Sequence, residues 1–377
     1  MKIAFFIQST SWGGLEMNTL NTAIFLKKKK QQVLLITNPK SRIYQEVKKT
    51  FYSTWLIGKT GKYFDFKNAL KISKKLKAEN IFTVFVIDNK DLDVIVLTKK
   101  FFYKKLNIIY QQQMQIAINK RDFLHTWRFG GINYWISPLE VLKKEVLQRT
   151  RFPEKRIVVI PLCVDINRFI KPKYSKKEAR KKLGILPKAP LIGIIGRVSP
   201  KKGQFFLIKA VEALRKKGVL VDLLIFGSPS LNESGEYLRQ MKQYVEDRGL
   251  ESCIYFHEYA SDVEMFYNAI DIFTLASESE TFGMVTVEAM LSSLPVIATN
   301  SGGTPEILAY GKFGLLYEYN NIEDYAEKVQ WTLAHKREVN HMAQEAGKNA
   351  AKYYSKDYEI EQILHLLKKL ENGSRET

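Results

Sequence analysis

The stretch DIFTLASESETFGMVTVEAM, residues 271–290, joins a short apolar segment to a helical pattern through a polar loop. DIFTLA has the length and apolar content of a strand buried on both faces of a sheet, and MVTVEAM continues as a helix. Strand, short loop and helix in this order form the repeating unit of an α/β protein. Open parallel sheets bind ligands at the carboxyl ends of their strands. The loop residue Glu280 and the helix residue Glu288 are therefore candidates for a binding site.

The same unit recurs along the chain. Strand candidates in the first half are KIAFFI, QVLLIT, FTVFVID, NIIYQ, YWIS and RIVVIP, and those in the second half are PLIGIIG, VDLLIFG, CIYFHE, DIFTLA, PVIAT and FGLLY. Helical patterns separate most of them, at residues 15–26, 66–76, 138–147, 204–217, 233–247, 262–268 and 284–291. Two such series predict an α/β fold with two doubly wound, Rossmann-like domains, each a parallel sheet covered by helices on both faces.

A segment rich in proline and lysine, PLCVDINRFIKPKYSKKEARKKLGILPKAP, interrupts both series and is the predicted join between the domains. We place the first domain at residues 1–165 and the second at residues 166–355. Residues 321–371 are predicted to be helical with a break near KYYSKDY. The last helix, at residues 356–371, is expected to pack back on the first domain.

Length and composition narrow the class of protein. At 377 residues the chain is longer than one ordinary core supports, and a hydrophobic content of 45% excludes a disordered or fibrous protein. Two cysteines, Cys163 and Cys253, cannot build a disulfide framework, which fits a reducing compartment. The apolar run near the N-terminus is too short for a signal peptide core, and no segment reaches the roughly 18 apolar residues of a spanning helix. We expect a cytoplasmic protein.

The net charge of +20 is concentrated in the first half of the chain. Residues 1–165 hold 30 Lys and Arg against 12 Asp and Glu, whereas residues 166–377 hold 29 against 27. A lysine-rich genome that decorates solvated faces is one explanation, but it would raise the charge of both halves. The asymmetry favours an anionic partner such as a membrane surface, a phosphorylated acceptor or a nucleic acid. The chain has no recognised nucleic-acid reader motif, so we expect no nucleic-acid partner.

The loop after the first predicted strand of the second domain carries two cations. In GRVSPKKG, Arg197 and Lys202 flank a short segment that Gly196 and Gly203 keep compact, and a helix follows. Permanent cations beside a helix start suit a diphosphate, which they would hold by charge-assisted hydrogen bonds. Ordinary surface charge is the alternative, and the position at a strand's carboxyl end favours the functional interpretation.

The corresponding loop of the first domain contains Gly13 and Gly14 in STSWGGLEMNTL. Glycines between a strand and a helix let backbone N–H groups approach a ligand closely at the helix N-terminus. The loop lacks the GxGxxG fingerprint of dinucleotide-binding proteins, and a plain tight turn explains it equally well.

The helix that begins near Phe282, Gly283 and Met284 places backbone amides and the positive end of its dipole beside Glu280. Acids at a helix start can simply complement the dipole. Glu288, however, sits among Val, Ala and Met, where an uncompensated carboxylate is costly. A polyhydroxylated ligand would satisfy both kinds of group, because hydroxyls donate to carboxylates and accept from amides.

These motifs together resemble a known family. Glu280, seven intervening residues and Glu288 reproduce the E-x7-E motif of the large retaining glycosyltransferase family that includes sucrose synthases and many bacterial mannosyl- and glucosyltransferases. GRVSPKKG resembles that family's donor-diphosphate loop, SGGTPEIL at residues 301–308 its next cleft loop, and GGLE its N-terminal glycine loop. IPLCVDINRF resembles its interdomain strand, although Cys163 stands where glycine is usual. The likeness covers essentially the whole chain.

The resemblance implies a GT-B architecture, two Rossmann-like domains facing across a cleft, with the nucleotide-sugar held by the second domain. It assigns the diphosphate to Arg197 and Lys202, the ribose hydroxyls to Glu288, and the sugar ring near its anomeric centre to Glu280. Contacts to the nucleotide-sugar are also expected from Gly13, Gly14, Gly196, Phe282, Gly283, Met284 and Val285. No cofactor and no metal is implied, because the two cations neutralise the leaving group.

By the same resemblance, the protein is expected to transfer a hexose with retention of configuration to a saccharide or lipid-linked acceptor in cell-envelope glycan synthesis, such as lipopolysaccharide or glycolipid. Its basic first domain would hold it peripherally at the anionic inner face of the cytoplasmic membrane. Lys120, which follows the loop IIYQQQMQIAINKRD, is a candidate for binding an anionic acceptor, with plain surface charge as the alternative.

One position departs from the family. Related sequences commonly carry a histidine in the loop that here reads IIYQQQMQIAINKRD, and Gln113 is the residue that best fits its place. Glutamine can bind a sugar hydroxyl but accepts no proton at neutral pH. The alternative prediction is therefore a catalytically impaired relative that binds nucleotide-sugar or serves as a partner subunit. The nearby His125, in DFLHTWRF, is expected to be structural.

Overall fold

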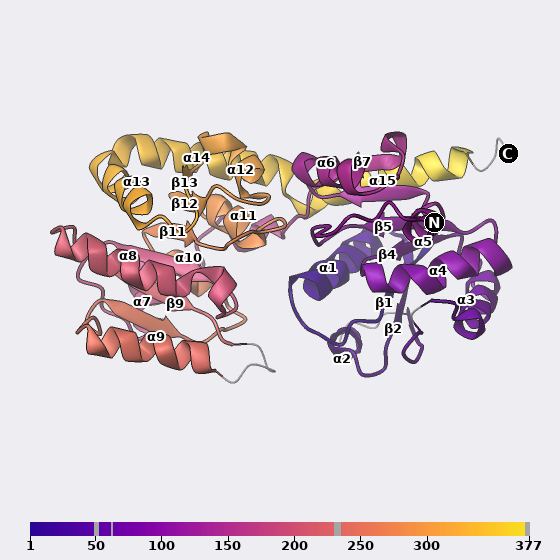
Figure 1. Cartoon of the computed structure of the whole chain (residues 1–377), viewed down its shortest axis with the longest axis horizontal. Coiled ribbons are helices and arrows are strands. Elements are labelled where there is room, and N and C mark those ends of the chain that lie inside the picture. The colour runs from indigo at the N-terminus through magenta and orange to yellow at the C-terminus, as the bar shows by residue number, and fades with distance from the viewer. Residues whose placement is uncertain (49–52, 62, 230–234, 374–377) are drawn as a thin grey trace. The chain divides into compact units, whose positions relative to one another are not determined.

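The computed structural model describes residues 1–48, 53–61, 63–229 and 235–373 (Figure 1). The chain divides into two compact units, Met1–Cys163 with Lys356–Thr377, and Val164–Ser355. The division after Cys163 lies two residues before the expected boundary at 165, and the C-terminal segment belongs to the first unit.

The first unit contains a seven-stranded parallel sheet in the order β3-β2-β1-β4-β5-β6-β7. Its strands are β1 (Lys2–Ile7), β2 (Gln32–Thr37), β3 (Ser53–Leu56), β4 (Thr83–Val86), β5 (Asn107–Gln111), β6 (Tyr134–Ser137) and β7 (Ile157–Val159). Its helices are α1 (Gly14–Lys28), α2 (Arg42–Val47), α3 (Phe66–Ala78), α4 (Leu92–Leu97), α5 (Phe123–Phe129), α6 (Glu140–Arg149) and α15 (Lys356–Gly373).

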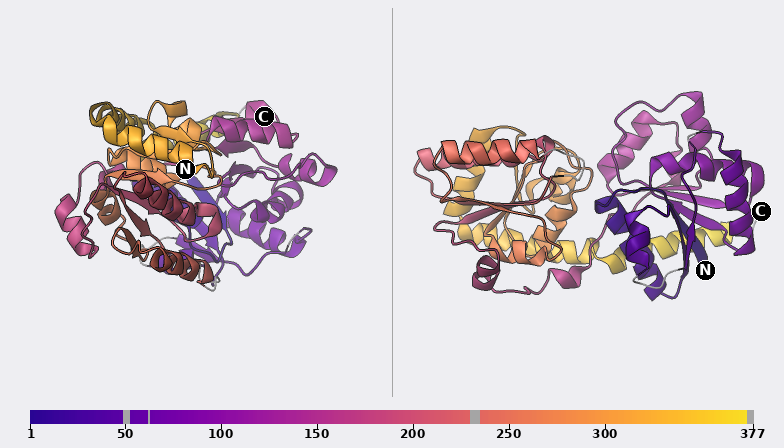
Figure 2. Two further views of the ribbon diagram at one scale, coloured as in Figure 1. Left: turned by 60° about the vertical axis from the view of Figure 1, so that its left-hand side comes forward. Right: turned by 90° about the horizontal axis from the view of Figure 1, so that it is seen from below.

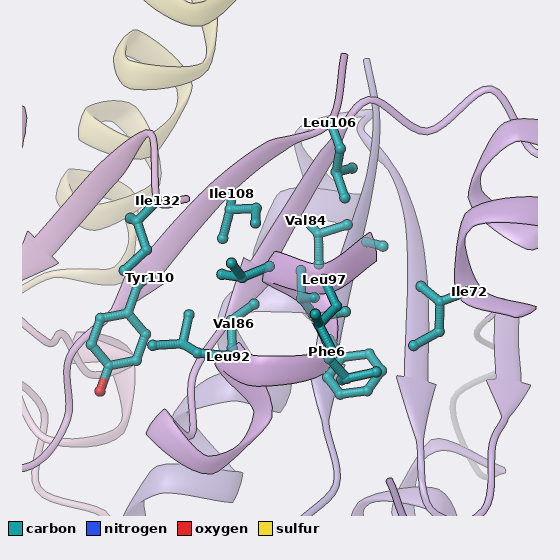
Figure 3. Close-up of a cluster of buried hydrophobic side chains, with 14 of the residues drawn as sticks. Phe6, Ile72, Val84, Val86, Leu92, Leu97, Leu106, Ile108, Tyr110 and Ile132 are labelled. Atoms are coloured by element: carbon teal, nitrogen blue, oxygen red, sulfur yellow. The ribbon is translucent and has the colours of Figure 1, made fainter. Parts of the chain in front are cut away.

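The strand KIAFFI shows why these segments are apolar throughout. Ile3 and Phe5 point into a core closed by α1, α2 and α15, whereas Ala4 and Phe6 point into the opposite core, closed by α3 to α6. Figure 3 shows the second of these cores, with Phe6 near Ile72 of α3. A strand covered on both faces needs apolar residues at every position, which is the pattern of a parallel sheet between helices.

Helix α15 is tied to the first unit by a buried polar network as well as by its apolar face. The Lys356 ammonium donates to Glu359 at 2.5 Å and to Asn18 at 2.7 Å, and Gln111 donates to the Glu359 carboxylate at 3.2 Å. Lys356 and Glu359 are both buried. The right-hand view of Figure 2 shows α15, in yellow, running along this unit. Because a buried charge is tolerated only when it is paired, this network fixes where the C-terminal helix returns.

The second unit contains a six-stranded parallel sheet in the order β10-β9-β8-β11-β12-β13. Its strands are β8 (Leu191–Ile195), β9 (Asp222–Phe226), β10 (Ile254–His257), β11 (Ile272–Leu275), β12 (Val296–Thr299) and β13 (Leu315–Tyr317). Its helices are α7 (Lys176–Lys182), α8 (Gln204–Lys216), α9 (Glu236–Asp247), α10 (Glu264–Ala269), α11 (Met284–Leu291), α12 (Thr304–Ile307), α13 (Ile322–Ala334) and α14 (Lys336–Tyr353).

Helices cover both faces of this sheet as well. Helices α8, α9 and α13 close one core against β8 and β9. On the other face α10 lies so close to β8 that a side chain at Gly193 would meet Phe266 of that helix at 2.8 Å and Ile270, the residue that follows it, at 2.5 Å. Glycine in the middle of a strand therefore marks a close helix–sheet approach here.

The two-domain α/β fold predicted from the sequence is confirmed, and every strand candidate contains a strand. Several features were not predicted correctly. The strand β3 and the helices α2, α4, α5 and α12 were missed, and the segment taken as the join between domains contains α7, which packs against α10 within the second unit. The start of the predicted helix at residues 233–247 lies outside the described residues, and α9 begins at Glu236. Among the helices described, none combines the length and apolar character that crossing a bilayer requires.

Candidate functional site

The candidate site lies at the carboxyl ends of β8 and β11. These strands are neighbours in the sheet, and from them the strand order runs outward in opposite directions, through β9 and β10 on one side and through β12 and β13 on the other. Such a reversal is the switch point at which open α/β sheets bind ligands, because the two flanking loops diverge there. The loop after β8 holds Arg197 and Lys202, and the loop after β11 holds Glu280.

Lys202 and Glu280 are in contact across the switch point. The Lys202 ammonium donates to Glu280 Oε1, and the hydroxyl of Ser277 donates to the same oxygen at 2.9 Å. Both ionic side chains remain partly exposed, the lysine 34% and the glutamate 16%. Because both side chains keep some exposed surface, the cation can bind a phosphate and the carboxylate can bind a hydroxyl group of one ligand.

Two glycines allow the loops to approach this closely. Gly203 has φ +77°, and a side chain there would lie 2.1 Å from the carbonyl oxygen of Ala276. Gly302, in the loop after β12, has φ +60° and would bring a side chain within 2.3 Å of the Glu280 carbonyl oxygen. The N–H of Gly303 donates to that carbonyl at 2.8 Å. Only glycine combines the left-handed backbone with this lack of space. The loops after β8, β11 and β12 therefore form one packed layer.

Arg197 lies in the same loop as Lys202 but is held less firmly. Its side chain is exposed, and its carbonyl accepts a hydrogen bond from the Gln204 amide at 2.8 Å. Among the residues that the structure describes, no carboxylate pairs with its guanidinium. The loop thus presents a free cation beside Lys202. Gly196, which precedes it, has φ +146° with open space where a side chain would be.

Helix α11 starts at the predicted position. Gly283 has φ +78° and is the N-cap, and Met284 and Val285 form the first turn. The amides of a first helical turn have no acceptor within the helix and point along its axis. Phe282 is buried, and its ring packs against that of Tyr354 at 5.8 Å between centroids. A rigid aromatic anchor therefore fixes the loop from which these amides project.

Glu288, one turn into α11, has a perturbed pKa. Burial raises the pKa of Glu288 to about 7, and the hydroxyl of Tyr267, which donates to Glu288 Oε2 at 2.7 Å, and the charge of Arg168 offset this only in part. Arg168 itself forms two hydrogen bonds with Glu264, at 2.7 and 2.9 Å. A carboxylate half protonated near neutral pH is poised to gain hydrogen-bond donors from a ligand.

From the sequence, only a ligand was expected to donate hydrogen bonds to Glu288. This expectation was wrong, because the Tyr267 hydroxyl donates to its carboxylate. The ion pair of Arg168 with Glu264 was also missed, although Arg168 lies in the motif IPLCVDINRF. Tyr267 and Glu264 belong to α10, whose sequence carries no motif. Only the fold brings α10 beside α11, so no signal in the sequence indicated these contacts.

The remaining predicted residues lie in the first unit. The N–H of Gly13 donates to Glu16 Oε2 at 2.9 Å, so a ligand would have to displace Glu16 to reach that amide. A side chain added at Gly14 would meet no atom within 4 Å. Gln113 is partly buried, and among the described residues its Nε2 has no hydrogen-bond partner. Partial burial, with the charge of Arg128 adding to it, lowers the pKa of Lys120.

The neighbours of Gln113 have structural partners. Gln111 binds Glu359, as described above, and Gln112 accepts a hydrogen bond from the Trp135 indole at 3.0 Å. His125 contacts Asp122, which caps α5, at 2.5 Å, in keeping with the expected structural role. Within the described ranges, no group of three His, Cys, Asp or Glu side chains has the arrangement of a metal site.

Comparison with known proteins places this geometry in context. Residues 175–352 match the family Glycosyl transferases group 1. D-inositol 3-phosphate glycosyltransferase of Corynebacterium urealyticum is 30% identical over 220 residues, 57% of this chain and 51% of that protein. Mannosylfructose-phosphate synthase of Agrobacterium fabrum is 28% identical over 218 residues, 56% of this chain and 48% of that protein. The chain thus spans about half the length of the curated relatives it matches.

Solved structures are similar over nearly the full chain. A glycosyltransferase from Rickettsia africae has a TM-score of 0.87 at 20% identity and covers 98% of both chains. The Anabaena protein HepE, solved in complex with UDP-glucose, has a TM-score of 0.81 at 20% identity. The alignment covers 98% of this chain and 100% of HepE. At this identity the likeness shows the fold, and the protein is therefore an α/β protein of the GT-B class.

Within that class, residues 175–352 are similar to the group 1 glycosyl transferases, the family whose E-x7-E motif residues 280–288 resemble. The matched segment contains the loops after β8, β11 and β12. The roles of the individual residues stay predictions.

Proposed function

We propose that the protein is a retaining glycosyltransferase that transfers a hexose from a nucleoside-diphosphate sugar. The contact between Lys202 and Glu280 at the switch point of the second unit carries this proposal, because it joins a phosphate-binding cation to a hydroxyl-binding carboxylate. HepE, a protein of the same fold, has been solved with UDP-glucose, which supports this class of donor.

In this proposal Arg197 and Lys202 bind the diphosphate and stabilise it as it leaves. Breaking a bond between a sugar and a diphosphate creates an oxocarbenium-like centre and an anionic leaving group. Fixed cations on the leaving side lower the barrier, and losing one such contact typically costs about 3 kcal/mol. Two cations can supply the charge that a divalent metal provides elsewhere, so the transfer is proposed to need no metal and no cofactor.

The carboxylates hold the rest of the donor. Glu288 accepts hydrogen bonds from the ribose hydroxyls, and Glu280 contacts the sugar ring near its anomeric carbon. The amides at the start of α11, around Gly283, Met284 and Val285, bind sugar hydroxyls. Retention follows when a phosphate oxygen of the departing diphosphate takes the proton of the acceptor hydroxyl on the same face of the sugar. That step requires no protein base, which agrees with Gln113 in place of a histidine.

The acceptor is proposed to be a saccharide or a lipid-linked saccharide of a cell-envelope glycan, with Gln113 and Lys120 as its candidate contacts. The relatives differ here, since their names point to an inositol phosphate and to a mannosylfructose phosphate. A cytoplasmic protein with excess positive charge in residues 1–165 would act peripherally at an anionic membrane.

The experiment that tests this function is turnover of UDP-, GDP- and ADP-sugars by the purified protein, followed by NMR of the sugar released or transferred. The first product should keep the anomeric configuration of the donor, and Glu280→Gln should lower the rate at least about a hundredfold if Glu280 contacts the reacting centre. Inversion would refute the mechanism. Tight binding without any turnover would favour the catalytically impaired relative instead.

A further inference from the structure

A group of exposed apolar side chains lies on the first unit. We call it the aromatic patch, and it consists of Tyr63, Phe64, Phe66, Phe101, Phe123 and Leu124. The most exposed members are Phe123 at 78% and Phe64 at 66%. Exposed phenylalanines are common singly, but a contiguous group of this size marks an interaction surface.

Ring contacts and a shared cavity connect the members of the patch. The ring of Phe66 lies 6.4 Å from that of Phe64 and 5.2 Å from that of Phe101, centroid to centroid. Phe64 and Phe123 both line one cavity of about 270 Å³. The elements that carry the patch, α3, α5 and the π-helical turn Thr98–Phe102, cover the same face of the first-unit sheet, together with α4 (Figure 1). The patch is therefore one surface and not a set of isolated residues.

The cavity is lined mainly by apolar side chains, and the charged side chains in its wall are paired with one another. Trp127 and Leu97 contribute to its wall. Its polar lining consists of the buried pair Arg128 and Asp93, 3.3 Å apart, and of His125, whose ring contacts Asp122. A paired guanidinium and carboxylate attract neither a free anion nor a free cation strongly. The dominant property of this surface is therefore its exposed hydrocarbon.

The loop that carries Tyr63 and Phe64 holds both residues in an unfavourable backbone conformation. Their φ angles are +59° and +42°, in the left-handed region that bulky side chains rarely occupy. Such a conformation persists only where the surrounding structure enforces it, and it is frequent at binding surfaces. Here its effect is to display two consecutive aromatic side chains on the surface.

Cations surround the patch. Lys67 is exposed next to Phe66, Arg121 is exposed close to Phe123, and Lys100 lies with its ammonium 4.2 Å from the centre of the Trp127 ring. The neighbouring acids have local partners. Asp65 caps α3 by accepting from Asn68, and Asp122 caps α5 by accepting from His125. Capping leaves both carboxylates charged, so the three cations outnumber them by one, and the rim has a small net positive charge of the same sign as that of residues 1–165.

We infer that the aromatic patch is the surface by which the protein docks on an anionic lipid bilayer. Aromatic rings favour the boundary between headgroups and acyl chains, and lysine and arginine beside them contact anionic headgroups. A protein partner would have to supply a complementary acidic apolar face, whereas an anionic membrane supplies both features at once. The inference rests on the membrane contact proposed above and locates it.

The test is binding to vesicles of phosphatidylcholine and phosphatidylglycerol in equal parts, without donor or acceptor. The double substitution Phe123→Ser and Leu124→Ser should weaken binding at least tenfold. The matched control is Leu186→Ser with Leu220→Ser, which removes leucines that are 84% and 60% exposed in the second unit and should leave binding unchanged. Because all four side chains are exposed, both double variants should fold, and circular dichroism verifies this.

A fluorescent reporter gives a second, independent reading. Tryptophan placed by Phe123→Trp should shift its emission to the blue when vesicles are added, because the ring leaves water, and Leu186→Trp should not shift. Neutral phosphatidylcholine vesicles should produce a smaller effect than the mixed vesicles, since they lack the anionic headgroups.

Three results would overturn the inference. If wild-type protein binds the mixed vesicles and the Phe123/Leu124 variant binds equally well, the membrane contact survives but lies elsewhere. If wild-type protein does not bind vesicles, both the patch and the membrane contact fail, while donor turnover with a water-soluble acceptor remains a separate test of the enzyme. Self-association through the patch, visible as a dimer that the Phe123/Leu124 substitutions dissolve, would also contradict it.

Discussion

The affinity of the protein for its donor should depend on pH through Glu288, and the substitution Glu288→Gln should remove that dependence. In the ligand-free protein, burial raises the pKa of Glu288 from its ordinary value of 4.5 to about 7. Ribose hydroxyls that donate to the carboxylate stabilise its ionised form and lower this pKa in the complex. Binding must therefore release a proton whenever Glu288 is protonated beforehand, and affinity should rise with pH.

The size of the effect follows from the pKa. With a value of about 7, roughly one Glu288 in eleven is ionised at pH 6 and roughly ten in eleven at pH 8. If the complex holds the carboxylate ionised throughout, the affinity at pH 8 exceeds that at pH 6 about tenfold, which corresponds to about 1.4 kcal/mol.

Isothermal titration with a nucleoside-diphosphate sugar at several pH values, each in two buffers of different ionisation enthalpy, measures both the affinity and the number of protons released. At pH 7 about half a proton should be released per site. A suitable control is Asp91→Asn, because burial raises the pKa of Asp91 to about 8 and no contact between Asp91 and the donor is proposed. This variant should keep the pH dependence, whereas Glu288→Gln should bind with a nearly flat profile.

The reasoning fails if Glu288→Gln shows the same slope of affinity against pH as the wild type, or if Asp91→Asn abolishes it. Proton uptake in place of release would contradict the assigned direction of the pKa change.

Three further predictions follow from other parts of the structure. Gly203→Ala should lower the free energy of unfolding, measured in urea, by about 2–5 kcal/mol, because the added methyl group clashes with Ala276 and the φ angle is unfavourable for alanine. The control Gly218→Ala, at φ +80° with no neighbouring atom, should cost only about 1–2 kcal/mol, and equal losses would argue against the packed loops. Lys356→Met should lower the free energy of unfolding by about 3–5 kcal/mol, because it leaves the buried Glu359 carboxylate without its ion-pair partner. The double variant with Glu359→Leu should regain part of this stability, and no regain would show that packing and not charge dominates. Chelation by EDTA should leave donor turnover unchanged, since Arg197 and Lys202 are proposed to neutralise the diphosphate, and a loss reversed by added Mg²⁺ would refute the metal-independent mechanism.

Most of the fold could be predicted because parallel strands between two helical layers are apolar at every position. The strand at residues 2–7 shows this, since its side chains enter two different cores. The missed strand β3 lies at the sheet edge and is only partly buried, so its sequence STWL lacks that pattern. The missed helix α4 fails for the opposite reason. All its residues, 92–97, are buried, and a helix without a polar face shows no helical period.

The proximity of Lys202 and Glu280 could be predicted because both follow strands whose carboxyl ends meet at one edge of the sheet. The surroundings of Glu288 could not. Tyr267 is 21 positions away in the chain, and the pairing of Arg168 with Glu264 spans 96 positions. Contacts of this range depend on how helices pack, which the local sequence does not specify. The occupied amide of Gly13 was missed because the side chain of Glu16 turns back onto it.

The most direct test of the donor site compares two adjacent lysines on one loop. Lys202 contacts Glu280 at the switch point, whereas Lys201 is 83% exposed and lies 3.6 Å from Glu278. Titration of UDP-, GDP- and ADP-sugars into the wild type should find at least one that binds. Lys202→Met should then weaken that donor by about 10- to 150-fold, the loss of a charge-assisted hydrogen bond, while Lys201→Met should bind like the wild type. Failure of all three donors to bind, or equal binding by both variants, would contradict the proposed site.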